Sequence, residues 1–471
     1  MINLIRNELC KIFHKKAIYV YTTIILVILV AVSVFGKIYR NQDSEVGYDD
    51  SYVEMLKDGL DYYDLSDKNE LDMFIGDKVI IDIYYLSNKY SFESPERYYV
   101  ENVIEPLVYD KYHLEYENKD IEGSKEIQKE IDSALKKLDS FDWKESIKEE
   151  KKRIEEELKL VKDSDNNEVE LLKIELWCLN YRLDNKIPYS YSSDSILVDE
   201  YKSASVEYLS LVKDESLIKN ADELRNKRSV EERYHVTKFK LEHKLYGDSQ
   251  ELKDIVVSGV SYVDGLIIIA IIIIAGSIIS EEFSRGTIKQ LLVKPHSRCK
   301  ILTSKIIASL IAITLFVIIY NGVFILANCY EFSDFKSVLG TNVVYDFNLG
   351  KVREINFLGH CLYGFISVLP AYLIIFFITI FMGVLTTSTV ATISSGLGIY
   401  FLYDIFSLAL KPKLLSFFPF YCWDLSPFMF GGLSENKYST FGKSLIIDIV
   451  TVILLAVLSY VLFKKKEIKN Q

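Results

Sequence analysis

The sequence predicts an all-α polytopic membrane protein, with six transmembrane helices and a large, mainly α-helical extracellular domain between the first and second. Three observations lead to this fold class: apolar runs long enough to cross a bilayer, one long acidic segment without such runs, and short basic segments beside the runs. Residues 37–255 hold 53 of the 66 acidic groups and 34 of the 55 basic groups, so this segment carries a net charge of −19 and the rest +8. The charge thus separates a soluble segment from an apolar one.

The first apolar run, residues 17–36, contains no charged residue. About 20 residues at about 1.5 Å each span a hydrocarbon core of about 30 Å, so this run is long enough for a transmembrane helix. A cleaved signal peptide is the alternative, but the run exceeds the usual apolar length of about 7–15 residues and no A-x-A site follows it. We therefore predict that residues 1–36 form an N-terminal interfacial helix followed by the first span.

Residues 2–16 fit the interfacial helix because apolar residues recur on one helical stripe, with polar residues elsewhere. The stripe consists of Ile2, Ile5, Leu9, Ile12 and Phe13. The alternative is a short soluble start of the first span.

Residues 37–255 are predicted to form the extracellular domain. Apolar residues recur at three- and four-residue steps over 122–162, with a phase break near Phe141, and again over 168–185. The polar sequence DSDNN at 163–167 separates these stretches, which predicts a helical hairpin. The acidic, tyrosine-rich residues 37–120 are expected to mix helix and loop.

Residues 256–471 are predicted to hold five further transmembrane helices. We place them at 257–280, 301–328, 357–386, 389–410 and 444–463. Residues 411–440 contain Pro412, Pro419 and Pro427 together with Trp423, so they are too broken for one span but apolar enough to dip into the interface.

The basic segments predict the orientation. Lysine and arginine gather before the first span, between the second and third, and after the sixth. With six spans these segments fall on one side, which the positive-inside rule assigns to the cytoplasm. We therefore expect a multi-pass protein of the cell membrane with both termini cytoplasmic and with residues 37–255 and the loop at 329–356 outside.

No catalytic motif is visible, so we do not expect an enzyme. Gly442-Lys443-Ser444 resembles the end of a phosphate-binding loop, but position 437 is lysine where that loop needs glycine. The six histidines form no HExxH pair, and the six cysteines form no CxxC pair, so neither a metal site nor a disulfide framework is indicated. No cofactor is expected, and if ATP drives the protein, the ATPase is another chain.

The most informative stretch is residues 275–310. An apolar helix runs into Glu281-Glu282, followed by a short helical piece that contains Gly286 and stops at Pro295, then basic residues and another apolar helix. This pattern is typical of a short amphipathic helix on the cytoplasmic surface, whose charges could meet a soluble partner. The alternative is a basic loop that only obeys the orientation rule.

The sequence EEFSRGTIKQLLVKPHSR, residues 281–298, followed by an apolar helix with Lys305, resembles the coupling-helix region of ABC-2 type permeases, the membrane subunits of a class of ABC transporters. The opening MINLIRNELCKIFHKK is similar to that family's N-terminal interfacial helix, and residues 411–430 resemble its short re-entrant outer helices. Smaller members have only a short loop where this chain has residues 37–255. In that respect the chain is similar to larger permeases of Gram-positive bacteria.

The resemblance implies a separate ABC ATP-binding subunit that docks on a cytoplasmic coupling helix at 281–295. It also implies a second permease half, identical or different, with membrane lipids around the spans and no nucleic-acid partner. The residues expected to contact the ATP-binding subunit are Glu281, Glu282, Arg285, Gly286, Thr287, Lys289 and Pro295.

Three acidic residues lie in or near the predicted spans: Asp264, Asp404 and Asp448. An intramembrane carboxylate costs several kcal/mol unless it faces water or a partner. For Asp264 we expect a place on the transport path or in helix packing; an end residue that extends to the interface is the alternative for all three. The small residues of the fifth span, among them Thr392, Gly396 and Gly398, predict close helix packing.

We therefore interpret the chain as the permease subunit of an ATP-driven transporter, and expect an exporter. One rival is a membrane-anchored sensor or surface-interaction protein that acts through its extracellular domain; a sensor usually needs fewer spans. Another is an intramembrane enzyme, which the absence of paired catalytic residues within the spans disfavours.

Overall fold

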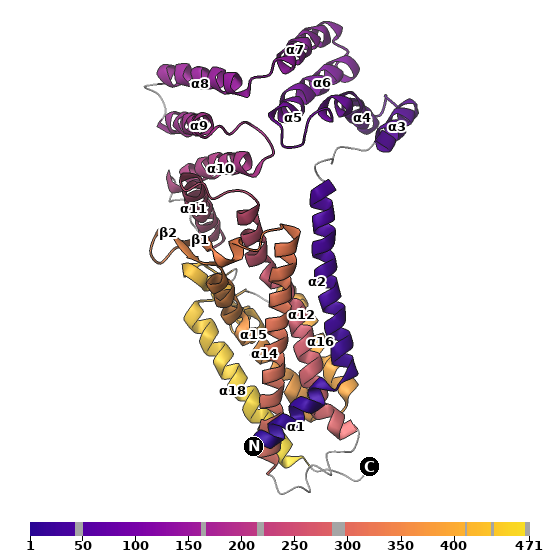
Figure 1. The fold of residues 1–471 in the computed structure, drawn as a ribbon, viewed down its shortest axis with the longest axis vertical. Coiled ribbons are helices and arrows are strands. Elements are labelled where there is room, and N and C mark those ends of the chain that lie inside the picture. The colour runs from indigo at the N-terminus through magenta and orange to yellow at the C-terminus, as the bar shows by residue number, and fades with distance from the viewer. Residues whose placement is uncertain are drawn as a thin grey trace. The chain divides into compact units, whose positions relative to one another are not determined.

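The structure is a computed structural model in which helices predominate (Figure 1). It describes residues 1–42, 50–161, 166–213, 221–284, 297–409, 412–434 and 438–466. The chain divides into two compact units. The first comprises Met1–Phe35, Ile218–Ser229 and Asp248–Gln471, and the second comprises Gly36–Leu217 and Val230–Gly247.

Five helices of the described chain are long and apolar enough to cross a membrane. The spans lie in α2 (Lys16–Gln42), α12 (Asp248–Ser284), α14 (Arg298–Glu331), α15 (Phe357–Thr386) and α18 (Phe441–Lys465). They confirm five of the predicted apolar helices. The remaining one corresponds to α16 (Thr389–Ala409), whose described apolar stretch, Thr389–Leu402, is shorter than a full span, so the count of six stays a prediction.

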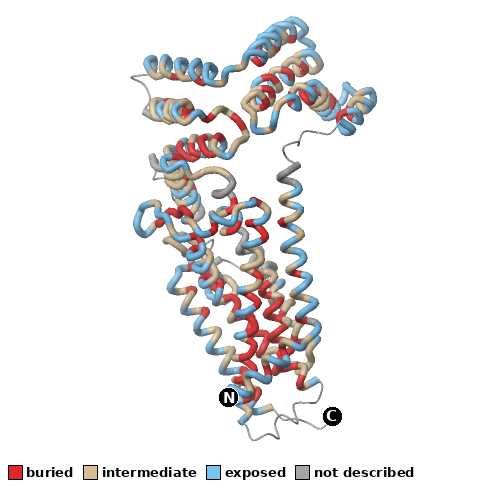
Figure 2. Tube along the Cα trace, in the orientation of Figure 1, coloured by how far each residue is buried: buried red, intermediate tan, exposed pale blue. Residues whose placement is uncertain are grey.

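The core of the first unit follows α12 and α15. Figure 2 shows buried residues concentrated along these helices, whereas α18 is largely exposed. Ile272, Ala275, Ile374 and Ile375 are fully buried, and α12 packs against α14, α15 and α16. These apolar runs have no polar face because their surroundings on every side are either protein or, in a membrane, lipid.

Local signals fix where these helices begin and end. The Asn356 side chain accepts a hydrogen bond of 2.9 Å from the Gly359 N–H and so caps the start of α15. Thr387, with φ of 58°, ends the same helix in the left-handed region. Only Thr387 and Ser388 separate α15 from α16, which agrees with the predicted span bounds at 386 and 389.

A short helix and a strand pair complete the first unit. α1 (Ile2–Phe13) is the predicted N-terminal helix. The loop expected at 329–356 contains an antiparallel pair that we did not predict, β1 (Thr341–Asp346) and β2 (Lys351–Asn356), with Thr341 opposite Asn356. The predicted broken segment forms α17 (Pro412–Leu415), η7 (Pro419–Tyr421) and η8 (Ser426–Gly431), and η6 (Ser337–Leu339) precedes β1.

The second unit is built from short and medium helices. The predicted break near Phe141 is confirmed: α7 (Ile121–Asp139) ends before it and α8 (Trp143–Leu160) starts after it, because the Asp142 side chain caps α8 by accepting from the Lys144 N–H at 2.9 Å. α8 packs against α9 (Asn166–Asn185) through Ile147, Ile154, Leu172 and Leu179, which is the predicted hairpin.

The other elements of this unit are also helical where the structure describes them. They are α3 (Asp50–Gly59), η2 (Leu60–Tyr62), α4 (Lys68–Ser87), α5 (Pro95–Tyr99), η3 (Val100–Ile104), α6 (Glu105–Tyr112), η4 (His113–Glu117) and α10 (Ser193–Lys213); α11 (Ala221–Glu242) belongs to both units.

Candidate functional site

One end of the first unit brings together several segments that the sequence analysis assigned to the cytoplasm. Arg298, at the start of α14, donates hydrogen bonds of 3.0 and 2.9 Å to the carbonyls of Lys464, in the last turn of α18, and Lys466, just after it. Lys466 in turn donates to the carbonyl of Leu385 at 3.1 Å, near the turn between α15 and α16. A common side of the membrane for these segments stays a prediction.

α1 docks at the same end by its apolar stripe (Figure 1). Ile12 is 1% exposed, Ile5 and Leu9 pack against the core, and the ring of Phe13 lies 6.2 Å from that of Phe316 on α14. Ile2, the first residue of the predicted stripe, is 80% exposed and takes no part in this packing.

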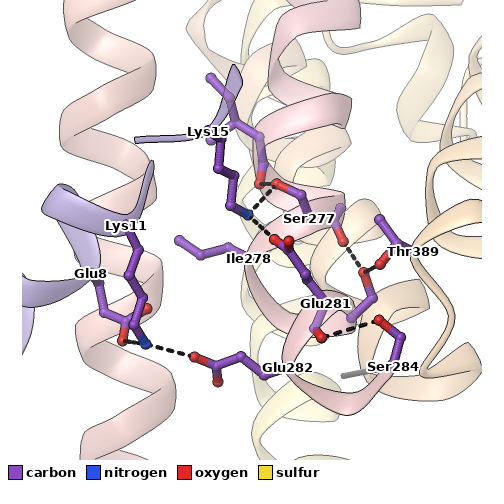
Figure 3. Close-up of polar contacts among 12 residues, drawn as sticks. Glu8, Lys11, Lys15, Ser277, Ile278, Glu281, Glu282, Ser284 and Thr389 are labelled. Carbon is purple, nitrogen blue, oxygen red and sulfur yellow. Dashed lines mark hydrogen bonds and ion pairs between the residues drawn. The ribbon is translucent and has the colours of Figure 1, made fainter. Parts of the chain in front are cut away.

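Four charged side chains form ion pairs that join α1 to the end of α12 and the start of α14. We call this set the ion-pair cluster and define it as Glu8, Lys11, Glu282 and Lys305. Lys305 Nζ lies 2.8 Å from Glu8 Oε2 and 2.7 Å from Glu282 Oε1, and Lys11 Nζ lies 2.8 Å from one oxygen of each carboxylate. Figure 3 shows Glu8, Lys11 and Glu282 turned toward one another.

The two carboxylates and two ammonium groups of the ion-pair cluster balance in charge. The Lys305 side chain is 1% exposed and the Glu8 side chain 4%, so water solvates neither charge. Each charge is stabilised by the opposite charge beside it instead. Lys305 also donates to the carbonyl of Ile278 at 3.3 Å. Hydrogen bonding by several partners is what makes a buried charge tolerable.

The charges of the cluster shift the ionisation of its α1 members. Burial opposes the charged form of Glu8, but the positive charge of Lys305 and hydrogen bonds from Lys11 and Lys305 outweigh it and lower the pKa of Glu8 below 4.5. Glu8 therefore stabilises the folded state at neutral pH, and that contribution disappears only as the pH falls through its lowered pKa. Burial likewise opposes the charged form of Lys11, yet the hydrogen bonds that Lys11 donates to Glu282 and Glu8 raise the pKa of Lys11.

A second contact joins the start of α2 to α12. Lys15, between α1 and α2, lies 2.6 Å from Glu281 Oε2 and donates to the Ser277 hydroxyl at 2.9 Å (Figure 3). The junction of α1 and α2 is thereby held on the same helix end as the ion-pair cluster.

Of the residues predicted to contact an ATP-binding subunit, Glu281 and Glu282 are described. Both carboxylates have partners within the chain, in Lys15, Lys11 and Lys305. Their contact with another subunit stays a prediction. The others, Arg285, Gly286, Thr287, Lys289 and Pro295, lie outside the described residues.

The sequence analysis missed Glu8 as a site residue. Two signals mark the pair it forms with Lys305. Glu8 falls on the apolar stripe of α1, between Ile5 and Ile12, and Lys305 is the only charged residue in the apolar run 301–328. A single charge on each of two apolar surfaces indicates that the charges meet.

Asp264 has a partner that favours helix packing. The Tyr372 hydroxyl on α15 donates a hydrogen bond to Asp264 Oδ1 on α12, and the next residue, Gly265, lies close to the Tyr400 hydroxyl on α16. Asp448 is 1% exposed and so is enclosed by the protein, whereas the side chain of Asp404 lies outside the described residues.

The Asp264–Tyr372 contact gives a testable prediction. Tyr372→Phe should lower the free energy of unfolding by about 1 kcal/mol, since the half-buried carboxylate of Asp264 loses its donor. Tyr363→Phe is the matched control, because Tyr363 lies on the same helix and its side chain is 44% exposed. Thermal unfolding in detergent measures both; equal midpoints would show that the hydroxyl of Tyr372 contributes nothing.

In the part of the chain that the structure describes, no group of three His, Cys, Asp or Glu side chains could hold a metal ion.

Comparison with known proteins gives one match. The model of a family described as "Protein of unknown function (DUF2705)" matches residues 227–469. No curated protein and no solved structure matches the chain. The matched region covers α12 to α18, including Glu282 and Lys305 of the ion-pair cluster, and excludes α1. Because the match spans more than half of the 471 residues, the chain belongs to the DUF2705 family.

Proposed function

We propose that this chain is the permease subunit of an ABC-2 type transporter, an exporter driven by a separate ATP-binding subunit. The observation that carries the proposal is the ion-pair cluster, which fastens α1, α12 and α14 together where the predicted coupling helix 281–295 begins. The resemblance of residues 281–298 to a coupling helix gives the identity of the partner.

Movement of one chain by ATP hydrolysis in another requires a mechanical connection. A force applied just after Glu282 acts on α12 directly, on α14 and α1 through Lys305, and on the start of α2 through Lys15 and Glu281. Buried ion pairs suit such a mechanical connection because separating the two partners would leave an unpaired charge in an apolar interior. The helices would therefore move as one body.

The remaining parts of the proposal rest on the sequence. A separate ATP-binding subunit is needed because the chain carries no phosphate-binding loop. A second permease half, identical or different, would complete the transport path, with residues 37–255 outside the cell and both termini in the cytoplasm.

Affinity purification from the native membrane tests the docking of the ATP-binding subunit. The tagged wild-type chain should capture an ATP-binding protein, and Gly286→Trp should reduce that capture at least tenfold, because a bulky side chain prevents close approach at a glycine. Leu385→Trp is the control, since Leu385 is 47% exposed on another segment of the same end and should leave capture unchanged.

Two results would contradict the proposal. One is the absence of any ATP-binding protein from the wild-type sample, which a membrane-anchored sensor would give. The other is equal capture by Gly286→Trp and wild type at equal membrane levels, which would place the docking surface elsewhere.

A further inference from the structure

A buried carboxylate without a partner lies on α18. Asp448 is 1% exposed, and neither of its oxygens receives a hydrogen bond from any residue that the structure describes. The neighbours of Asp448 on the same helix, Ile446, Ile449 and Val450, are between 49% and 63% exposed, so the acid lies on the one covered side of an otherwise exposed helix.

The nearest lysine along the chain does not neutralise this acid. Lys443 donates to the Ser416 hydroxyl at 2.6 Å and to the carbonyl of Tyr438 at 3.2 Å, and its ammonium lies 3.9 Å from the centre of the Phe417 ring. Buried charges in proteins are normally paired, and intramembrane carboxylates normally face a partner or a pathway. A buried carboxyl without such a partner either takes up a proton or is joined by a cation, and none of the described residues gives Asp448 a hydrogen-bonded cation.

Asp448 also lines a pocket between α15 and α18. The pocket has a volume of about 410 Å³, within the range of small-molecule sites, and apart from Asp448, Ser367 and Tyr363 every lining residue is apolar. Ile366 and Ile453 at its edge are 52% and 57% exposed, so a molecule dissolved in the membrane has direct access.

Apart from the Tyr363 hydroxyl, the polar groups of the pocket are acceptors or donors that are already used. Pro370 lies within α15 and has no N–H, so the helix supplies no donor from that position to the carbonyl of Ile366, and both residues line the pocket. The Ser367 hydroxyl is already used, because it donates to the carbonyl of Tyr363 at 3.0 Å. A ligand that matches this pocket brings hydrogen-bond donors.

Aromatic rings add a preference for positive charge. Tyr363, Phe428 and Phe441 line the pocket, and the rings of Phe428 and Phe441 lie edge to face with centres 6.2 Å apart. The faces of such rings attract ammonium groups. A neutral acyl chain fills the apolar volume but leaves the carboxylate unpaired.

We propose that this pocket binds a cationic amphiphile: a molecule with an apolar body and one protonated amino group that pairs with Asp448. Both Asp448 oxygens are covered by protein in the structure, so binding requires the Asp448 side chain to turn toward the amino group. The apolar body of the ligand occupies the space between α15 and α18. The site belongs to this chain alone, so its binding does not depend on the proposed ATP-binding subunit.

Equilibrium binding of radiolabelled dodecylamine to the purified full-length chain tests this proposal, at concentrations below those at which the amine forms micelles. The wild type should bind it saturably, and unlabelled dodecanol, which has the same chain but no charge, should compete at least tenfold more weakly. Asp448→Asn should weaken dodecylamine binding at least tenfold. Asp254→Asn is the control, an exposed acid on α12 outside the pocket, and should bind like the wild type.

A second variant keeps the test decisive if Asp448→Asn is poorly folded. Leu445→Trp retains the carboxylate but fills the pocket, and it should also weaken binding at least tenfold. Unchanged binding by a well-folded Asp448→Asn, or equal competition by dodecanol, would overturn the proposal and leave an apolar pocket without charge selection.

Discussion

Replacing Lys305 by methionine is expected to destabilise the folded protein by about 3–5 kcal/mol, because it removes the buried cation and leaves Glu8 and Glu282 with only the part-exposed Lys11 as counter-ion. The Lys305 side chain is 1% exposed, so water cannot take the place of the lost ammonium. The loss should appear first at α1, whose attachment depends on the cluster. Hydrogen–deuterium exchange over residues 2–13 should rise, together with a lower thermal unfolding midpoint.

Lys300→Met is the control for this substitution. Lys300 lies on the same helix, less than two turns away, and is exposed, so its replacement should change stability by no more than about 0.5 kcal/mol. If the two variants had equal unfolding midpoints and equal exchange in α1, the ion-pair cluster would not hold that helix.

The second large effect is expected at Gly396 on α16. A Cβ atom there would lie 2.8 Å from Ile272 Cγ2 on α12 and 3.3 Å from Thr379 Oγ1 on α15, closer than side-chain carbons approach one another. Gly396→Leu should therefore force the three helices apart, at a cost of about 1–3 kcal/mol or more. The yield of monodisperse protein and its unfolding midpoint measure the effect.

Gly398 provides the matched comparison two residues away. A Cβ atom on Gly398 has no atom of another residue within 4 Å. Gly396→Leu and Gly398→Leu raise the helix propensity of α16 by the same amount. The difference in stability between the two variants therefore measures the packing contact at Gly396. A Gly398 variant as unstable as the Gly396 variant would mean that α16 does not pack through Gly396.

The sequence predicted helices well where the signal is local. The five long apolar helices follow from length and hydropathy alone, and the boundary between α7 and α8 follows from a phase break beside the capping residue Asp142. The small residues of α16 were correctly assigned to packing at Thr392, which is fully buried, and at Gly396, but Gly398 lies open. Spacing along a helix does not say which small residue meets a neighbour.

The unpredicted features depend on contacts between distant positions. Glu8 and Lys305 are 297 residues apart. The sequence marks each as a single charge on an apolar surface, but only the fold brings the two surfaces together. The strand pair β1–β2 was not predicted. Each strand has six residues, and two strands are marginal alone, so their signal in the sequence is weak. Its signals are the β-branched and aromatic residues Val343, Val344 and Tyr345, followed by a turn at Gly350, which has φ of +61°.

Asp448 illustrates a similar limit. Its position near the start of α18 was compatible with a side chain that extends to the membrane interface. In the structure Asp448 is buried because α15 and the segment around Leu425 and Phe428, from other parts of the chain, pack against α18. Hydropathy describes a helix by itself and does not locate the neighbour that covers one side of it.

The most direct measurement of the proposed function is native mass spectrometry of the complex extracted from its own membrane. The permease proposal predicts an assembly of two membrane subunits, one of them this 54.4 kDa chain, with at least one ATP-binding chain. That assembly should lose the ATP-binding chain in Gly286→Trp while the membrane subunits stay together. A wild-type mass that corresponds to this chain alone, or to copies of it without an ATP-binding chain, would contradict the assignment as the membrane subunit of an ABC transporter.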